Sequence, residues 1–214
     1  MPYPSKTDRQ TILSAALKQL AHVGIRDLSL RTLAASLNLA PNAIYRYFSD
    51  RSALEASLAS EAARQMELAL RRAADGREPV TAIREMSSAY MKFAKDNRNL
   101  YDVMMSPQVP KHDAIQHESL WTFTVDQVQR IAGPDRAAQA SVALWAFLHG
   151  AVALEAAEVF RESKPASGLG FGLDAWFMAV STRGGPIEGL QTKPTKRMAT
   201  KKASAREGSA RRGK

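Results

Sequence analysis

The sequence predicts an all-α protein of about nine helices, and three observations support that fold class. Apolar residues recur at helical spacing along most of the 214 residues. Prolines and glycines divide these stretches into segments of helical length, and no stretch alternates polar and apolar residues as a half-buried strand does. The composition changes near the C-terminus, so we expect three parts: residues 1–50, residues 51–186 and residues 187–214.

The first two helices are predicted over residues 7–23 and 30–37. In both, apolar side chains form a stripe along one face, which suits a helix packed against a core. Gly24 can end the first helix, because glycine readily adopts the left-handed conformation of a helix terminus. Ser29 can cap the second helix with its hydroxyl, and Asn38 can turn the chain after it, since asparagine tolerates positive φ.

A third helix is predicted over residues 41–48, one tight turn after the second. Pro41 fits its first turn, where the missing N–H is no loss. Asn42, Tyr45 and Arg46 are spaced at i, i+3 and i+4, on the face opposite the core. An amide, a phenol and a guanidinium suit a surface of phosphates and base edges, so we expect this helix to enter the major groove of DNA.

The start of the next helix adds a phosphate site to this prediction. Asp50 can cap that helix, which places Arg51 in its first turn, where free N–H groups and a cation together favour an anion. Residues 1–51 also contain seven Lys and Arg against three Asp. A positive N-terminal unit supports a DNA-binding role.

Residues 12–54 resemble the tetracycline-repressor (TetR) family of bacterial transcriptional regulators. The motifs are Gly24 after the first helix, Leu30-Arg31-x-Leu33-Ala34, Ile44-Tyr45-x-Tyr47-Phe48, and Arg51 followed by Leu54. The resemblance implies that the first two helices support the third, and that Tyr45, Tyr47 and Arg51 touch DNA. The full set of predicted DNA contacts is Arg31, Ala40, Asn42, Tyr45, Arg46, Tyr47 and Arg51.

Three residues depart from the commonest pattern of that family. Asn38 stands where glycine is usual, and Ala40 replaces the usual serine cap of the recognition helix. Asn42 stands where a small residue is usual. Because an asparagine side chain can make a bidentate contact to adenine, we expect Asn42 to help set the preferred operator sequence.

Residues 51–186 predict six more helices. On the first of them a buried apolar line is expected at Leu54, Leu58, Ala62, Met66 and Leu70. The expected spans are 51–74, a helix beginning at Pro79, 100–105, 112–132, a helix from Pro134 or Asp135 to Phe160, and 171–182, with a loop over 163–172. Three glycines in that loop (Gly168, Gly170 and Gly172) follow no strand, so they do not indicate a nucleotide site. Leu100-Tyr101-x-x-Met104-Met105 and Trp145-x-x-x-His149-Gly150 resemble a C-terminal subset of the TetR family named for a Trp-His-Gly signature.

Aromatic residues and methionines recur on several of these helices. Methionine adapts to irregular space, and a cavity lined in this way with one polar group suits a small apolar ligand. Each of these side chains also fits a plain core position, and it is the family resemblance that implies a ligand pocket. The candidate pocket residues are Met86, Tyr90, Met104, Trp121, Trp145 and His149.

Alanines are concentrated over residues 137–157, where small side chains would allow helices to approach closely. The TetR family pairs its last two long helices with those of a second subunit, which implies a homodimer and a palindromic operator. Residues 137–154 are uncharged and long enough to raise the question of a membrane span. Gln139, Ser141 and His149 within that stretch favour a buried helix instead.

The sequence does not predict an enzyme or a metal site. The four histidines lack the i, i+4 pairing of a helical zinc site, and no nucleophile and base stand at a familiar spacing. The absence of cysteine fits a reducing cytoplasm, and the polar first ten residues do not form a secretory signal. We therefore expect a cytoplasmic protein with no cofactor.

The C-terminal tail is strongly basic. Residues 191–214 contain nine Lys and Arg and one Glu, with Met198 as the one large apolar residue. Such a segment cannot bury enough surface to offset its ordering entropy, so we expect disorder. It is either a nonspecific DNA arm that adds salt-sensitive affinity or a dispensable, solubilising end.

Together these features predict a ligand-responsive transcriptional regulator, most often a repressor in the TetR family. The expected partners are double-stranded DNA, a second copy of the chain and an unidentified small-molecule effector. The alternative is a nonspecific, nucleoid-type DNA-binding protein dominated by its basic tail. A weaker third interpretation is a small-molecule binding protein that has lost DNA readout.

Overall fold

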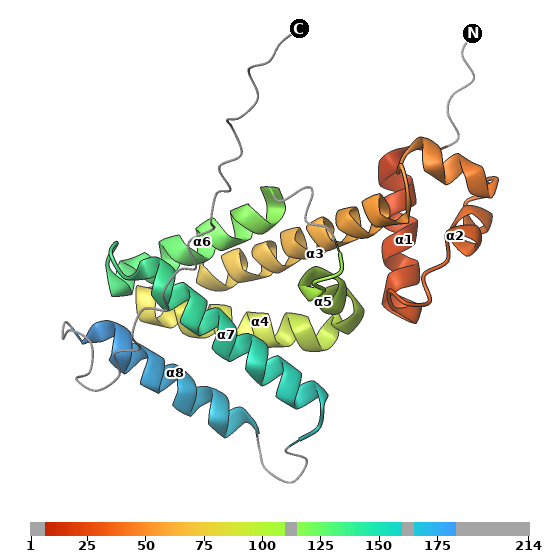
Figure 1. Cartoon of the computed structure of the whole chain (residues 1–214). Helices are drawn as coiled ribbons and strands as arrows, with labels where there is room; N and C mark the ends of the chain where they lie inside the picture. The colour runs from red at the N-terminus through yellow and green to blue at the C-terminus, as the bar shows by residue number, and fades with distance from the viewer. Residues whose placement is uncertain (1–6, 110–114, 160–164, 183–214) are drawn as a thin grey trace, which may run out of the picture. The chain divides into compact units, whose positions relative to one another are not determined.

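Eight α-helices and one 3₁₀ helix account for most of the residues described by the computed structural model, and those residues include no strand (Figure 1). The described residues are 7–109, 115–159 and 165–182. The predicted all-α fold is confirmed for this part of the chain. The tail predicted over residues 187–214 lies outside the described residues.

The head, residues 7–50, contains α1 (Arg9–Val23), α2 (Leu30–Ser36) and the 3₁₀ helix η1 (Pro41–Arg46). Its turns form as the sequence predicts, with Gly24 at φ 75° and Asn38 at φ 54°. The predicted Ser29 cap is also confirmed, because its hydroxyl accepts a hydrogen bond from the Thr32 N–H at 3.3 Å.

The prediction of an α-helix over residues 41–48 was wrong in type and length. Residues 41–46 form a 3₁₀ helix, in which the Ala43 N–H donates to the Ala40 carbonyl at 2.9 Å. The Ala40 side chain offers no capping oxygen. In so short a segment, the tighter i to i+3 bonds satisfy backbone groups that an uncapped α-helix would leave without a partner.

Six apolar side chains close the core of the head, and each is almost fully buried. They come from α1, the following loop, α2, η1 and the turn after it, so every part of the head contributes. The six are Ile12, Leu20, Leu28, Leu33, Ile44 and Phe48. Because Ile44 and Phe48 point inward one turn apart, the other side of η1 faces solvent.

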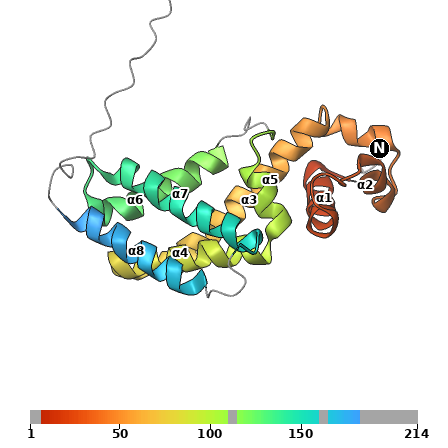
Figure 2. The same ribbon diagram turned by 60° about the horizontal axis from the view of Figure 1, so that its bottom comes forward.

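Helix α3 (Arg51–Ala74) continues from the head into the body, residues 51–182, as Figures 1 and 2 show. Its N-terminus is capped as predicted, because the Asp50 carboxylate accepts from the Ala53 N–H at 2.7 Å. The predicted apolar line along α3 is buried: Leu54, Leu58, Ala62, Met66 and Leu70. Three further helices pack on α3: α4 (Pro79–Asp96), α5 (Arg98–Met105) and α6 (Ile115–Ala132).

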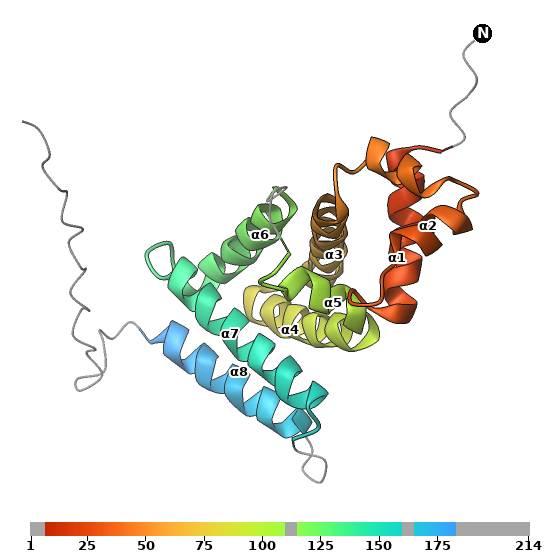
Figure 3. The same ribbon diagram turned by 45° about the vertical axis from the view of Figure 1, so that its right-hand side comes forward.

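Helices α7 (Ala137–Ala156) and α8 (Pro165–Ser181) lie side by side (Figures 1 and 3). The Trp176 indole on α8 donates to the Ala140 carbonyl of α7 at 3.0 Å. The guanidinium of Arg136, just before α7, donates to the carbonyls of Ala179 and Thr182 at 2.9 Å each. A cation at the C-terminus of α8 satisfies free carbonyls and complements the helix dipole.

The predicted loop over residues 163–172 was wrong, because α8 already begins at Pro165. Gly172 lies within α8, where the lack of a side chain makes room for a neighbouring helix. A Cβ on Gly172 would lie 2.2 Å from Cζ of Phe147, so its absence lets α8 approach α7 closely.

Other helix boundaries also differ from prediction. Helix α1 begins at Arg9 rather than Thr7, α5 begins at Arg98 rather than Leu100, and α7 begins at Ala137 rather than Pro134 or Asp135. Helix α7 ends at Ala156, with Glu158 at φ 51° beyond it. Boundaries are the part of an assignment that local pattern determines least. The predicted start of α6 at His112 and the predicted end of α7 at Phe160 lie outside the described residues.

By length and composition, α7 is apolar enough to cross a membrane. It packs instead against α4, α6 and α8, and Leu144, Leu148 and Val152 on it are buried. A single hydrophobic core includes residues of both head and body, from Ile12 to Val180. The domain boundaries expected at residues 50 and 186 therefore stay predictions.

Replacing the cap of α3 should destabilise the fold. We expect Asp50→Ala to lower the free energy of unfolding by about 1 kcal/mol, since it leaves an N–H without its acceptor at a partly covered junction. Asp50→Asn keeps an accepting oxygen and should lose much less. Urea unfolding followed by circular dichroism measures both, and equal losses would show that the cap oxygen is not what matters.

Candidate DNA-binding surface and effector cavity

The exposed side of η1 carries the three side chains on which the DNA-binding prediction depends. Asn42 and Arg46 are exposed, and Tyr45 keeps 50% of its surface open to solvent. Arg31 and Ala40 are exposed as well. The structure thus places five of the seven predicted DNA contacts on the surface of the head, and Arg51 at the start of α3 is exposed as well.

Tyr47 is placed differently. Its side chain is half-buried, and its hydroxyl donates to the Thr7 carbonyl at 2.9 Å. This bond ties the segment before α1 to the turn after η1. DNA contact by Tyr47 stays a prediction, and any such contact would share a hydroxyl that already has a protein partner.

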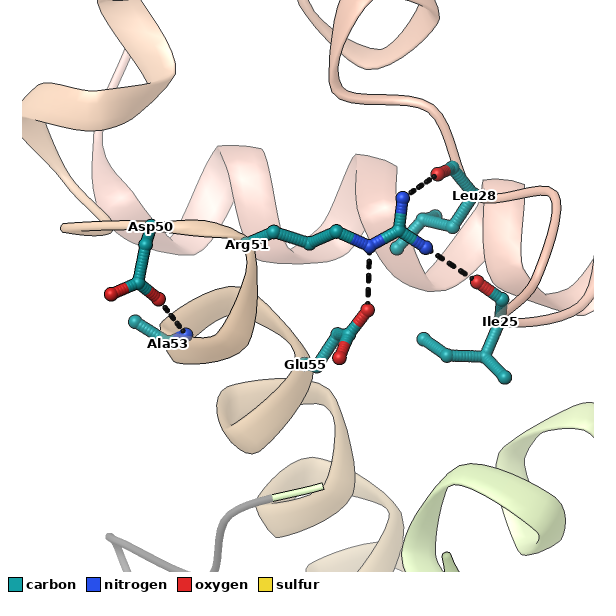
Figure 4. Close-up of polar contacts among 6 residues, drawn as sticks. All are labelled: Ile25, Leu28, Asp50, Arg51, Ala53 and Glu55. Atoms are coloured by element: carbon teal, nitrogen blue, oxygen red, sulfur yellow. Dashed lines mark hydrogen bonds and ion pairs between the residues drawn. The ribbon is translucent and has the colours of Figure 1, made fainter. Parts of the chain in front are cut away.

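Arg51 joins the head to α3 through three hydrogen bonds (Figure 4). Its guanidinium donates to the carbonyls of Leu28 at 2.9 Å and Ile25 at 2.8 Å, both in the loop between α1 and α2. Its Nε donates to Glu55 one turn along α3 at 2.7 Å. We name these contacts the Arg51 clamp. A guanidinium has five N–H donors, and the clamp uses three of them, so a phosphate contact by Arg51 also stays a prediction.

A second link connects the head to α5. The Asn99 amide donates to the Ala21 carbonyl, near the end of α1, at 3.0 Å. A Cβ on Gly24 would lie 3.2 Å from Oδ1 of Asn99, so the glycine gives this side chain room. The Arg9 guanidinium on α1 also donates to the Ser57 hydroxyl on α3 at 2.7 Å, so the head contacts both α3 and α5 through polar groups.

The body contains a cavity of about 30 Å³ between α3, α4, α6 and α7. Its walls include three of the six candidate pocket residues: Met86, Tyr90 and Trp145. The other lining residues are Met66, Leu70, Ser87, Leu120, Thr124, Leu144 and Leu148. Met66 and Leu70 belong to α3, so the helix that carries the Arg51 clamp also forms one wall of the cavity.

A chain of hydrogen bonds leads away from the cavity at Tyr90. The Tyr90 and Tyr101 hydroxyls lie 2.8 Å apart, and the Tyr101 hydroxyl lies 2.6 Å from Nδ1 of His149. Burial raises the pKa of the Tyr90 hydroxyl far above its usual value, and the bond with Tyr101 raises it further. Burial also raises the pKa of Tyr101. Both phenols therefore stay neutral at physiological pH.

The remaining candidate pocket residues surround the cavity without lining it. Trp121 packs on Trp145 with ring centroids 6.0 Å apart, and His149 reaches the wall through Tyr101. Met104 is buried on α5 and does not belong to the wall. Five of the six residues are thus connected, with Met86, Tyr90 and Trp145 at the cavity itself and Trp121 and His149 linked to it.

Two family models match the chain in succession. Residues 12–58 match the bacterial regulatory proteins of the tetR family, and residues 83–169 match a tetracyclin repressor-like C-terminal domain. The chain belongs to the TetR family. Its fold and its helix-turn-helix head are those of a DNA-binding transcriptional regulator. The Trp-His-Gly subset is not confirmed by the C-terminal match and stays a prediction.

Solved structures share the fold over most of the chain. A protein of unknown function from Rhodococcus sp. RHA1 is 24% identical, with a TM-score of 0.71 over 85% of this chain and all of that one. A TetR variant from Acinetobacter baumannii AYE in complex with minocycline is 21% identical, with a TM-score of 0.61 over 81% of this chain and 96% of that one. A TetR from Streptomyces coelicolor is 18% identical, with a TM-score of 0.62 over 82% and 98%. No curated protein matches the chain.

Within this TetR-family fold, sequence reasoning missed several functional positions. Tyr101 was visible only as part of a motif, and its role as the link between Tyr90 and His149 depends on three helices meeting. Met66 and Leu70 were predicted as core, which they also are. No local signal separates a core side chain from one that borders a cavity. Among the described residues, no cluster of His, Asp or Glu could hold a metal ion.

The salt dependence of DNA binding should separate Arg46 from Arg51. We expect Arg46→Gln to reduce the slope of log K against log salt concentration by about 1, because a free surface guanidinium can neutralise a phosphate. Arg51→Gln should weaken binding with little change in slope, because its guanidinium already holds two carbonyls and Glu55. Fluorescence anisotropy with labelled operator DNA measures both. If Arg51→Gln instead reduced the slope of log K against log salt concentration, Arg51 would be a phosphate contact.

Proposed function

We propose that the protein is a homodimeric, ligand-responsive repressor that acts in the cytoplasm and binds a palindromic operator through η1. The observation that carries this proposal is the double role of α3. Its first turn holds the head through the Arg51 clamp, and its middle forms a cavity wall at Met66 and Leu70. Recognition and effector binding thus act on one continuous helix.

The dimer is supported by an apolar surface on α7 and α8. Val142 on α7 and both Phe171 and Met178 on α8 are 57%, 80% and 74% exposed. Helices α7 and α8 are neighbours (Figure 3), and large exposed apolar side chains on neighbouring helices are typical of an interaction surface. In a twofold dimer these helices would meet their copies, and the two heads would face successive major grooves.

The size of the cavity sets a condition on the proposed ligand response. An apolar cavity of about 150 Å³ binds benzene, whereas this one measures about 30 Å³. A ring-sized effector therefore binds only when the walls move apart, and it favours the conformation in which they have moved. Such differential affinity is the requirement for a ligand to shift a conformational equilibrium.

Movement of the walls has two routes to the head. Displacement of Met66 or Leu70 acts on α3 and hence on the Arg51 clamp. Displacement of Tyr90 acts through its hydrogen bond on Tyr101, and Tyr101 stands two residues from Asn99 on α5. We propose that these shifts move the two heads out of register with the operator. The TetR variant solved with minocycline is consistent with an effector site in this fold.

Selection of bound sequences from a random DNA pool tests the function. We expect a palindrome with half-sites about one helical turn apart, and a base preference that changes in Asn42→Ala. Deletion of residues 191–214 should weaken binding to the selected and to random DNA alike, and leave their ratio unchanged. A ratio near one in the intact chain would favour the nucleoid-type alternative, and no binding at all would favour a protein that has lost DNA readout.

Charge on the α7 and α8 surface should break the dimer. We expect Phe171→Asp combined with Met178→Asp to weaken self-association at least about 100-fold, because buried carboxylates would lose hydration without a partner. Sedimentation velocity measures the association, and operator binding should fall with it. Ile115→Asp, at an exposed apolar residue on α6, is the matched control and should remain dimeric. An unchanged dimer in the double variant would place the interface elsewhere.

A further inference from the structure

The cavity in the body is lined almost entirely by hydrocarbon. Eight of its ten lining residues are apolar or aromatic, and the other two are Ser87 and Thr124. None of these ten residues carries a charge. A carboxylate or ammonium group moved into such a space would lose its hydration and find no counter-ion, which is strongly unfavourable.

The hydroxyl groups of the lining residues already have protein partners. The Ser87 hydroxyl donates to the Ile83 carbonyl at 2.8 Å, and the Thr124 hydroxyl donates to the Leu120 carbonyl at 2.8 Å. Both bonds run back along their own helices, so packing changes in the cavity do not free them. A ligand therefore meets no waiting donor at Ser87 or Thr124.

Tyr90 supplies the third lining hydroxyl, and the chain to His149 satisfies it. When Tyr90 donates to Tyr101 and Tyr101 donates to Nδ1 of His149, both phenol protons are used inside the protein. Tyr90 and Tyr101 are also packed edge to face, with ring centroids 5.8 Å apart. The polar end of the cavity is thus closed by contacts among α4, α5 and α7.

Two methionines give the wall room to adjust. Met66 on α3 and Met86 on α4 line the cavity, and unbranched thioether side chains repack at low cost. When both methionine side chains move aside, the remaining walls would contact a single aromatic ring or a branched hydrocarbon of similar size. Larger ligands would have to separate α3 from α4 or α6 as well.

We propose that the effector of this protein is a small, uncharged, hydrocarbon-like molecule. The uncharged wall disfavours a charged ligand, and the Tyr90, Tyr101 and His149 chain leaves no free hydrogen-bonding group for a polar one. This inference rests on the proposed function, since it names the class of molecule that the regulator senses. The cavity selects against polar ligands because it offers no hydrogen-bond partner, so a polar group on a ligand would be buried without one.

The test uses three ring compounds on the full chain: toluene, phenol and benzoate. Toluene and phenol have nearly the same size, so their difference reports the hydroxyl, while benzoate reports the charge. Isothermal titration calorimetry and thermal shift should show toluene binding at least about 10-fold more tightly than phenol, and no binding of benzoate. Phenol binding as tightly as toluene, benzoate binding, or no toluene binding would each overturn the inference.

Neighbouring leucines on α3 give a matched pair of variants. Leu70 lines the cavity and Leu68 is exposed on the same helix. Leu70→Phe should fill the cavity and reduce toluene affinity at least about 10-fold, whereas Leu68→Phe should leave it within about twofold. Equal toluene affinity in both variants would show that toluene binds elsewhere and would overturn the inference. Circular dichroism melting verifies that each variant folds.

Tyr101→Phe provides a test that does not depend on filling the cavity. This variant removes the Tyr101 hydroxyl, to which the Tyr90 hydroxyl is bonded. The Tyr90 hydroxyl can then donate a hydrogen bond to a ligand oxygen. The preference for toluene over phenol should therefore fall about fivefold. A preference that stays the same would contradict the role given to the chain.

DNA binding is measured separately, on the selected operator without any ligand. If the protein binds that operator but not toluene, the effector class is wrong and the DNA-binding function stands. If toluene binds but does not release operator DNA, the cavity is not the effector site. If toluene binds and the operator is released, both are supported.

Discussion

The structure depends on one guanidinium. Arg51 stands at the first position of α3 and holds two carbonyls of the loop between α1 and α2 while Glu55 holds it in turn. Charge-assisted hydrogen bonds of this kind are directional, so they constrain the angle between head and helix as well as their distance. The bonds from Asn99 to the Ala21 carbonyl and from Arg9 to the Ser57 hydroxyl add to this constraint, whereas the apolar contacts between head and body resist sliding and rotation much less.

Much of the fold could be predicted because its signals are local. Ser29 and Asp50 cap helices through oxygens three residues ahead of the N–H groups they accept from, and Asn38 turns the chain at positive φ. The buried line on α3 could also be predicted, because its apolar residues recur at helical spacing. On the exposed side of η1, outward placement of Asn42, Tyr45 and Arg46 followed from Ile44 and Phe48 pointing inward.

What could not be predicted depends on partners distant in sequence. Gly172 was expected in a loop, because nothing near it in the chain indicates that Phe147 needs the space of its missing side chain. Tyr47 and Arg51 were expected to face DNA, and their bonds to Thr7, Ile25 and Leu28 become visible only when the head is folded. The 3₁₀ geometry of η1 is a balance between short length and a missing cap, which residue pattern alone does not resolve.

The contacts of Arg136 have a consequence for assembly. This side chain, just before α7, holds the last carbonyls of α8, and Trp176 ties the middle of α8 to α7. The two helices that would meet a partner subunit are thereby secured to each other within one chain. If the chain dimerises as proposed, each subunit can keep both helices ordered before it meets its partner, and separated subunits can associate again without refolding these two helices.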